Sequence, residues 1–223
     1  MKRENKISVS VMCSDLMNLG QDIADLKRNG VDMLHVDVMD AHFVPNLTFG
    51  LDFIHAMHGV TDMPLDVHLM AEDPMPLIEH SDLREGDYLT VHVELDKNFE
   101  EIKNYLSTKG VKFGLAVSPE TPVESVKPYL PILDAVTLML VRPGFAGGKL
   151  IDGILDKVAE MRSFLDKEGY ENIEISVDGS VSCERAKLMA DMGASIFVGG
   201  TAGIYRKGMT LDESIPLFRA SID

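Results

Sequence analysis

The sequence has 223 residues and a mass of 24.6 kDa, a length at which α/β barrels often form one domain. Its formal net charge of −15 argues against nucleic acid and anionic membranes, which bind basic surfaces. No apolar run reaches the ~18 residues of a membrane span, and Cys13 and Cys183 form no CxxC motif. We therefore expect one domain over residues 1–223, free thiols and a cytoplasmic location, with neither nucleic acid nor membrane as a partner.

Short β-rich segments alternate with amphipathic helical segments along the chain. In chain order, the expected strands are Ile7–Met12, Met33–Met39, Pro64–Met70, Tyr88–Glu94, Lys112–Val117, Ala135–Val141, Glu174–Asp178 and Ser195–Gly199. Helical patterns between them include Asp15–Asn29, Phe99–Lys109, Lys149–Lys167 and Glu184–Asp191. Repeated strand–helix units need parallel pairing, and eight of them predict a closed (β/α)8 TIM barrel. A doubly wound open sheet is the alternative.

Polar side chains recur on one face of three predicted strands. Alternation along a strand places His35 with Asp37 in the second strand, and Asp66 with His68 in the third. Asp178 ends the seventh. If these faces point inward, two imidazoles and two carboxylates meet at the C-terminal mouth, where such barrels carry their sites. This donor set suits Zn²⁺, Fe²⁺, Mn²⁺ or Co²⁺ without choosing among them. The alternative is four isolated polar residues at strand ends.

Two further sets of side chains lie near predicted strand ends. Methionines near the ends of strands one, two, three and six either fill core gaps or line the site and keep water from a metal. These are Met12, Met39, Met70 and Met139. Strand four carries Thr90, His92 and Glu94 on one face, either as partners that orient a metal ligand or as ordinary hydrogen-bonded groups.

Glycine-rich stretches follow the last three predicted strands, at Pro143–Gly148, Asp178–Ser180 and Val198–Gly203. Loops in these positions bind phosphate in many barrels, through backbone N–H groups and often a short extra helix. Backbone donors bind an anion without Lys or Arg, which reconciles an anionic substrate with the acidic composition. We expect phosphate-binding loops at the C-terminal face.

The sequence resembles the ribulose-phosphate 3-epimerase family over nearly its whole length. The motifs that carry the resemblance are His35–Asp40, Phe43–Thr48, Asp66–Met70, Pro119–Pro122, Pro143–Phe145 and Val177–Gly179. It implies a ketose-phosphate 3-epimerase that holds one divalent metal ion, Zn, Fe, Mn or Co, through His35, Asp37, His68 and Asp178. Asp37 and Asp178 would be the two acid/base carboxylates. Ser10 and His68 would contact the sugar. The remaining substrate and phosphate contacts would come from Gly144, Phe145, Ala146, Gly147, Gly179, Ser180, Gly200 and Thr201.

Within this family the sequence is more similar to the D-allulose-6-phosphate branch than to the D-ribulose-5-phosphate branch. Ala146 and Ser180 stand where the ribulose branch usually has glycine, and Ser180 would offer the phosphate a hydroxyl donor. Arg142 departs from both branches, and it would reach a phosphate, pair with a surface carboxylate or do neither. Ala41 stands where Gly or Asn is common. The sequence thus predicts allulose 6-phosphate as substrate, with ribulose 5-phosphate as the alternative.

Two other functions remain to be weighed. The orotidine-phosphate decarboxylase and hexulose-phosphate synthase group needs a lysine in an Asp-x-Lys run, but Asp66-Val67-His68 has none. A non-catalytic phosphate-sensing barrel would keep the glycines and lose ligand candidates, all of which are present. Barrels of this kind often assemble, so we expect a homo-oligomer, although the sequence shows no readable interface.

Overall fold

Eight parallel strands close into a barrel in sequence order, with β1 paired to β8 as well as to β2. The structure is a computed structural model that describes residues 4–223, so residues 1–3 of the expected domain lie outside the described residues. The strands are β1 (Lys6–Ser10), β2 (Met33–Met39), β3 (Leu65–Met70), β4 (Tyr88–His92), β5 (Lys112–Val117), β6 (Ala135–Met139), β7 (Glu174–Asp178) and β8 (Ile196–Gly199). The predicted (β/α)8 TIM barrel is confirmed.

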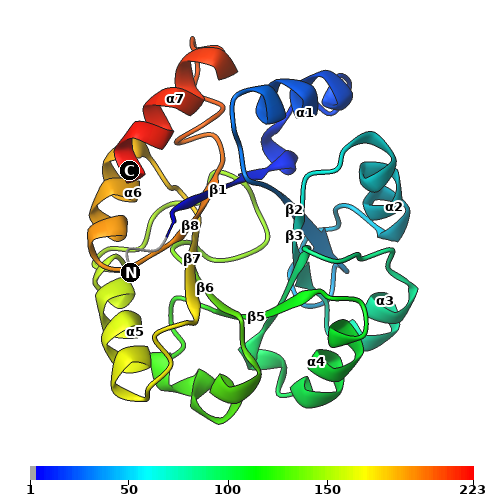
Figure 1. The fold of residues 1–223 in the computed structure, drawn as a ribbon, viewed down its shortest axis with the longest axis vertical. Coiled ribbons are helices and arrows are strands. Elements are labelled where there is room, and N and C mark those ends of the chain that lie inside the picture. The colour runs from blue at the N-terminus through cyan, green and yellow to red at the C-terminus, as the bar shows by residue number, and fades with distance from the viewer. Residues whose placement is uncertain (1–3) are drawn as a thin grey trace.

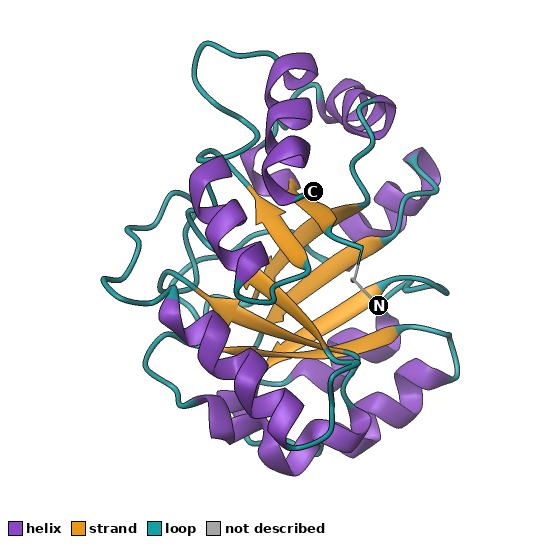
Figure 2. Cartoon of the chain, turned by 60° about the vertical axis from the view of Figure 1, so that its left-hand side comes forward, coloured by secondary structure: helices purple, strands orange, loops and turns teal. Residues whose placement is uncertain are grey.

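Helices form the outer ring of the barrel (Figures 1 and 2). The α-helices are α1 (Leu19–Arg28), α2 (Leu51–Val60), α3 (Pro74–His80), α4 (Phe99–Ser107), α5 (Asp156–Lys167), α6 (Cys183–Asp191) and α7 (Leu211–Ile222). The 3-10 segments are η1 (Val11–Cys13), η2 (Val93–Leu95) and η3 (Val123–Ile132), the last containing two prolines. None of the helices in residues 4–223 is long and apolar enough to cross a membrane.

Alternation along the strands separates two buried environments. Outward-facing residues such as Val36 and Val67 join the large core between the strands and the helices. Inward-facing residues at the N-terminal strand ends form a separate apolar floor, contributed by the four even-numbered strands as is usual in this architecture. Its members are Met33, Tyr88, Ala135 and Ile196. Polar inward residues therefore stand above an apolar floor, toward the C-terminal mouth.

Three predicted strands extend too far toward their C-terminal ends. The segment expected to reach Met12 ends at Ser10, and those expected to reach Glu94 and Val141 end at His92 and Met139. Residues just beyond each end are still buried, so the hydrophobic pattern continues after the hydrogen-bonded ladder has stopped. Beyond the strands the chain continues as 3-10 segments or loops, in which Met12 and Val141 line a cavity at the barrel mouth.

Two predicted helices begin earlier than the observed ones. The pattern at Asp15–Asn29 starts as a turn, and α1 begins only at Leu19. Likewise, the segment expected from Lys149 becomes helical as α5 at Asp156. Turn residues fill both gaps. The helices around 99–109 and 184–191 agree with α4 and α6 to within two residues.

Candidate active site

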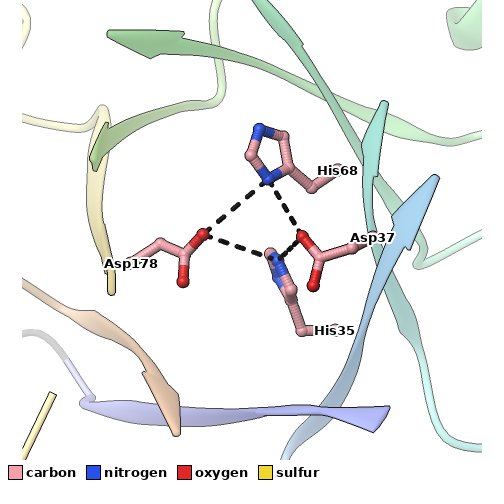
Figure 3. A group of neighbouring side chains, drawn as sticks. All are labelled: His35, Asp37, His68 and Asp178. Carbon is pink, nitrogen blue, oxygen red and sulfur yellow. Dashed lines mark hydrogen bonds and ion pairs between the residues drawn. The ribbon is translucent and has the colours of Figure 1, made fainter. Parts of the chain in front are cut away.

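Four side chains from three strands meet inside the barrel mouth (Figure 3). Oδ1 of Asp37 lies 3.3 Å from both Nε2 of His35 and Nδ1 of His68. Oδ2 of Asp178 lies 3.8 Å from the same His35 atom and 3.7 Å from the same His68 atom. The structure thus brings together all four predicted ligand candidates.

Strand register explains why the four side chains converge. On β2 and β3, His35 is aligned with Asp66, and Asp37 is aligned with His68. The two strands therefore present imidazole and carboxylate in alternating order at two levels of the barrel interior. Asp178 reaches the same level from β7, on the other side of the mouth (Figure 3).

The chemistry of this cluster fits one divalent metal ion. One donor atom from each of the four residues lies within 4.8 Å of all the others. Nδ1 of His68 is buried and has no hydrogen-bond partner, an unusual state for a buried polar atom. A cation bound there would accept its lone pair. Two nitrogen and two oxygen donors match the preferences of Zn²⁺ and other divalent transition metals.

The second ring nitrogen of His35 is hydrogen-bonded to a carboxylate deeper in the barrel. Nδ1 of His35 lies 2.8 Å from Oδ2 of Asp66, which also accepts a hydrogen bond from Oγ of Ser8 at 2.7 Å. Asp66 is buried and shares the inward face of β3 with His68. Sequence reasoning placed Asp66 on this face without giving it a role. The signal in the sequence that points to a role for Asp66 is the reversed order of the two residue types, His-x-Asp in β2 and Asp-x-His in β3.

The second ring nitrogen of His68 faces another histidine. Nε2 of His68 lies 2.9 Å from Nε2 of His92, whose Nδ1 lies 3.0 Å from Oε2 of Glu94. His92 and Glu94 therefore lie where partners that orient a ligand were expected. Thr90, the third residue of that predicted face, is aligned with His68 in the strand register and packs against Gly114.

The pKa values of the two candidate acid/base carboxylates are shifted in opposite directions. Burial raises the pKa of Asp178 above its ordinary value. Burial also disfavours the charged form of Asp37, but the charge of His35 and the hydrogen bond from His35 outweigh it and lower the pKa of Asp37 well below its usual range. Oγ of Ser10 donates a further hydrogen bond to Oδ2 of Asp37, at 3.2 Å.

One cavity at the mouth is lined by nearly all the predicted substrate contacts. All four methionines and both carboxylates lie on its wall, whereas His35 and His68 are buried beneath it. Cys13, which sequence analysis did not assign to the site, also lines it. The predicted residues on the wall are Ser10, Met12, Asp37, Met39, Met70, Met139, Gly144, Phe145, Ala146, Gly147, Asp178, Gly179, Ser180, Gly200 and Thr201.

Backbone packing explains a glycine in the wall of this cavity. Gly179 has a φ of +107°, and a Cβ there would lie 2.6 Å from Cγ2 of Val141, so only glycine fits. The next residue, Ser180, has a φ of +52° and donates its hydroxyl to the carbonyl of Gly148 at 2.7 Å. The hydroxyl proton therefore has an acceptor within the protein in this structure. Ala41, where Gly or Asn is common, also has a positive φ, of +61°.

The loop after β8 forms a single turn in place of the short extra helix. The N–H groups of Gly203, Ile204 and Tyr205 all donate to the carbonyl of Gly200, at 3.3, 2.9 and 3.1 Å.

Arg142, whose role the sequence left open, forms a surface ion pair in which Nε and Nη2 each lie 2.9 Å from Oε1 of Glu120. Both Cys13 and Cys183 are free thiols, as expected.

Comparison with known proteins agrees with this geometry. Residues 6–204 match the model of the ribulose-phosphate 3 epimerase family. The ribulose-phosphate 3-epimerase of Bacillus subtilis is 40% identical over 88% of this chain and 91% of its own length. The enzyme of the same name from Treponema pallidum is 36% identical over 96% of this chain and 99% of its own.

A solved structure supports the fold independently. KGPDC from Streptococcus mutans superposes with a TM-score of 0.68 at 14% identity, over 99% of this chain and 97% of that one. At this identity the likeness concerns the barrel alone. The two sequence relatives and the family match together confirm the predicted isomerase class, and the chain belongs to the ribulose-phosphate 3-epimerase family.

Proposed function

We propose that this protein is a D-ribulose-5-phosphate 3-epimerase that uses one divalent metal ion. The observation that carries the proposal is the cluster of His35, Asp37, His68 and Asp178, with its buried unpartnered Nδ1 atom. The substrate assignment is supported by the relatives named ribulose-phosphate 3-epimerase, which are 33% to 40% identical over most of the chain. The ion is Zn²⁺, Fe²⁺, Mn²⁺ or Co²⁺.

Epimerisation at C3 requires removal of a proton next to the C2 carbonyl and its return from the opposite face. Two carboxylates serve this purpose: one accepts the C3 proton while the other, protonated, donates to the other face. Asp37 and Asp178 come from strands on different sides of the mouth (Figure 3). When bound, a divalent ion supplies a Lewis acid that stabilises the negative charge of the enediolate.

The remaining wall of the cavity positions the substrate. Ser10 lies on this wall beside Asp37 and is proposed to contact the sugar, whereas His68, expected to do the same, lies beneath the wall and is proposed to act as a metal ligand. The phosphate is proposed to bind the loops that contain Gly144–Gly147, Gly179–Ser180 and Gly200–Thr201. Backbone N–H groups in these loops attract an anion without a cationic side chain, which fits a chain whose net charge is −15. Anchoring the phosphate would orient C3 for proton transfer.

D-Allulose 6-phosphate is the second candidate substrate. Ala146 and Ser180 favour it, because the ribulose branch usually has glycine at both positions. The hydrogen bond from Ser180 to Gly148 weakens this argument, since the hydroxyl already has its acceptor. We therefore place the ribulose substrate first.

A comparison of kcat/KM on the two sugar phosphates tests this choice. The substrates share their reacting ends and differ by one carbon before the phosphate. A site that fixes both ends discriminates a misplaced carbon by ~10–200-fold, and we expect the higher value with ribulose 5-phosphate. A higher value with allulose 6-phosphate would reverse the assignment. In that case Ser180→Gly and Ala146→Gly should move the preference toward ribulose 5-phosphate.

A further inference from the structure

A buried polar chain leads from His68 out to the surface of the barrel. Its first link joins Nε2 of His68 to Nε2 of His92 at 2.9 Å, and its second joins Nδ1 of His92 to Oε2 of Glu94 at 3.0 Å. Both imidazoles are 0% exposed, so water does not provide alternative partners. Each link therefore needs one donor and one acceptor.

The outer end of this chain can only accept hydrogen bonds. Oε1 of Glu94 accepts from the backbone N–H of Ser118 at 2.8 Å and from Oγ1 of Thr121 at 2.5 Å. Together with the hydrogen bond from His92, these bonds hold the pKa of Glu94 at about 2, against the effect of burial. The carboxylate is thus ionised at neutral pH, and its other oxygen requires a donor from His92.

The loop that binds Glu94 is itself fixed by a buried ammonium group. Nζ of Lys157 on α5 donates to the carbonyl oxygens of Ser118, Pro119 and Thr121, at 2.8, 3.1 and 2.5 Å. Lys157 is only 9% exposed. The ammonium draws the loop carbonyls toward α5, while the Ser118 N–H points to Glu94. The carboxylate therefore meets a fixed set of donors.

Donor and acceptor matching along the chain sets the tautomer of both rings. Glu94 requires the proton of His92 on Nδ1, so Nε2 of His92 carries a lone pair. This lone pair requires the proton of His68 on Nε2, which leaves Nδ1 of His68 as the unprotonated atom. Nδ1 is the atom that lies 3.3 Å from Asp37 and has no hydrogen-bond partner.

We infer that His92 and Glu94 are positioning residues that keep Nδ1 of His68 free of its proton and aimed at the metal. The inference rests on the proposed function, because it assumes that His68 binds the ion. A histidine ligand must present an unprotonated nitrogen to a metal, and the partner of its other nitrogen sets which one that is. Glu94 therefore acts on His68 through hydrogen bonds with His92, without a contact of its own with the ion.

Glu94→Gln tests the inference with a change of nearly equal size. The amide cannot accept on both sides: its NH₂ group faces either the donors of the loop or Nδ1 of His92. In the second case both rings reverse, and His68 carries its proton on Nδ1. Titration of metal-free protein with Co²⁺, followed by visible absorption, should give a Kd raised ~10–100-fold. Glu120→Gln is the matched control, because Glu120 pairs with Arg142 and takes no part in the hydrogen bonds between Glu94, His92 and His68. The Kd of this variant for Co²⁺ should not change.

A second pair of variants decides the question even if Glu94→Gln fails to fold. His92→Gln keeps an oxygen that accepts from Nε2 of His68, whereas His92→Leu has no acceptor. The Gln variant should bind Co²⁺ more tightly than the Leu variant.

Added Co²⁺ should also restore the epimerase activity of Glu94→Gln to the wild-type plateau, at a higher metal concentration. Equal affinity of the Gln and Leu variants, or a lower plateau at an unchanged Kd, would overturn the inference.

The outcomes separate the inference from the proposed function. If the wild-type protein binds no Co²⁺, both the metal site and the positioning role are wrong. If the wild-type protein binds one ion and Glu94→Gln binds it with the same Kd, only the positioning role is wrong. A weaker site in Glu94→Gln with an unchanged Glu120→Gln control supports both.

Discussion

Oδ2 of Asp66 lies 2.8 Å from Nδ1 of His35, directly below the candidate metal site. A carboxylate accepts this hydrogen bond, so His35 carries its proton on Nδ1. Its Nε2 atom faces Asp37 and Asp178, at 3.3 and 3.8 Å, and would offer its lone pair to a bound metal ion. Both histidines of the cluster thus have a buried partner on the nitrogen that turns away from the site.

Removal of the Asp66 carboxylate should weaken the metal site. Asp66→Ala leaves Nδ1 of His35 without its acceptor, and we expect the metal Kd to rise ~10–100-fold. Asp66→Asn should cost less, because an amide oxygen can still accept from both His35 and Ser8. Metal binding by the two variants, measured against a competing chelator, checks this order. A tighter site in the Ala variant than in the Asn variant would contradict the role of Asp66.

Asp37→Asn and Asp178→Asn should each reduce kcat ~10²-fold or more, as expected when an essential acid or base is lost. The amide neither transfers the proton nor supplies a charged ligand. Asp62→Asn is a suitable control, since Asp62 is an exposed surface residue paired with Lys27. Steady-state turnover of ribulose 5-phosphate measures all three variants. More than roughly a tenth of the wild-type kcat in either site variant would show that its assigned role is wrong.

Chelation should abolish activity if a divalent ion is required. We expect EDTA to inactivate the enzyme, and Zn²⁺, Mn²⁺, Fe²⁺ or Co²⁺ to restore it. His35→Ala and His68→Ala should weaken metal binding and leave the fold intact, because both residues lie toward the functional end of the barrel. Circular dichroism of the variants and metal analysis of the purified proteins check both expectations. Full activity in a verified metal-free sample would refute the Lewis-acid mechanism.

Glu94 should contribute to stability in a defined acid range. Hydrogen bonds from His92, Thr121 and Ser118 outweigh burial and lower its pKa from 4.5 to about 2. Between these values the unfolded state binds the proton more readily, so stability falls as the pH drops from 4.5 toward 2. Metal-free Glu94→Gln lacks this component and should lose less of its unfolding free energy between pH 6 and pH 3 than wild type. Urea unfolding at both pH values measures the difference, and equal losses would argue against it.

Much of the fold could be predicted from hydrophobic periodicity alone. The bounds of β2, β5 and β7 agree with the prediction to the residue. Where the chain continues beyond a strand as a 3-10 segment, as at Val11 and Val93, burial continues after strand pairing stops. Periodicity reports burial, not the hydrogen-bonded ladder, so these ends were predicted too long.

The cluster of candidate metal ligands was predictable, because His and Asp alternate along two neighbouring strands. His-x-Asp on β2 and Asp-x-His on β3 fix two levels of side chains once the strands are parallel and in register. The contacts of Glu94 with Ser118 and Thr121 were not predictable, since they depend on how the loop after β5 packs. The hydroxyl of Ser180 turns toward Gly148 for the same kind of reason, a backbone conformation that sequence alone does not reveal.

Solvent exchange at C3 tests the central claim most directly. In D₂O, the metal-loaded protein acting on D-ribulose 5-phosphate should introduce one deuterium at C3 and form D-xylulose 5-phosphate, as followed by proton NMR. Asp37→Asn and Asp178→Asn should each suppress the formation of product, because inversion at C3 needs both proton transfers. If xylulose 5-phosphate accumulates with no solvent deuterium at C3, or if C3 does not exchange and no product forms, the two-carboxylate epimerase mechanism is contradicted.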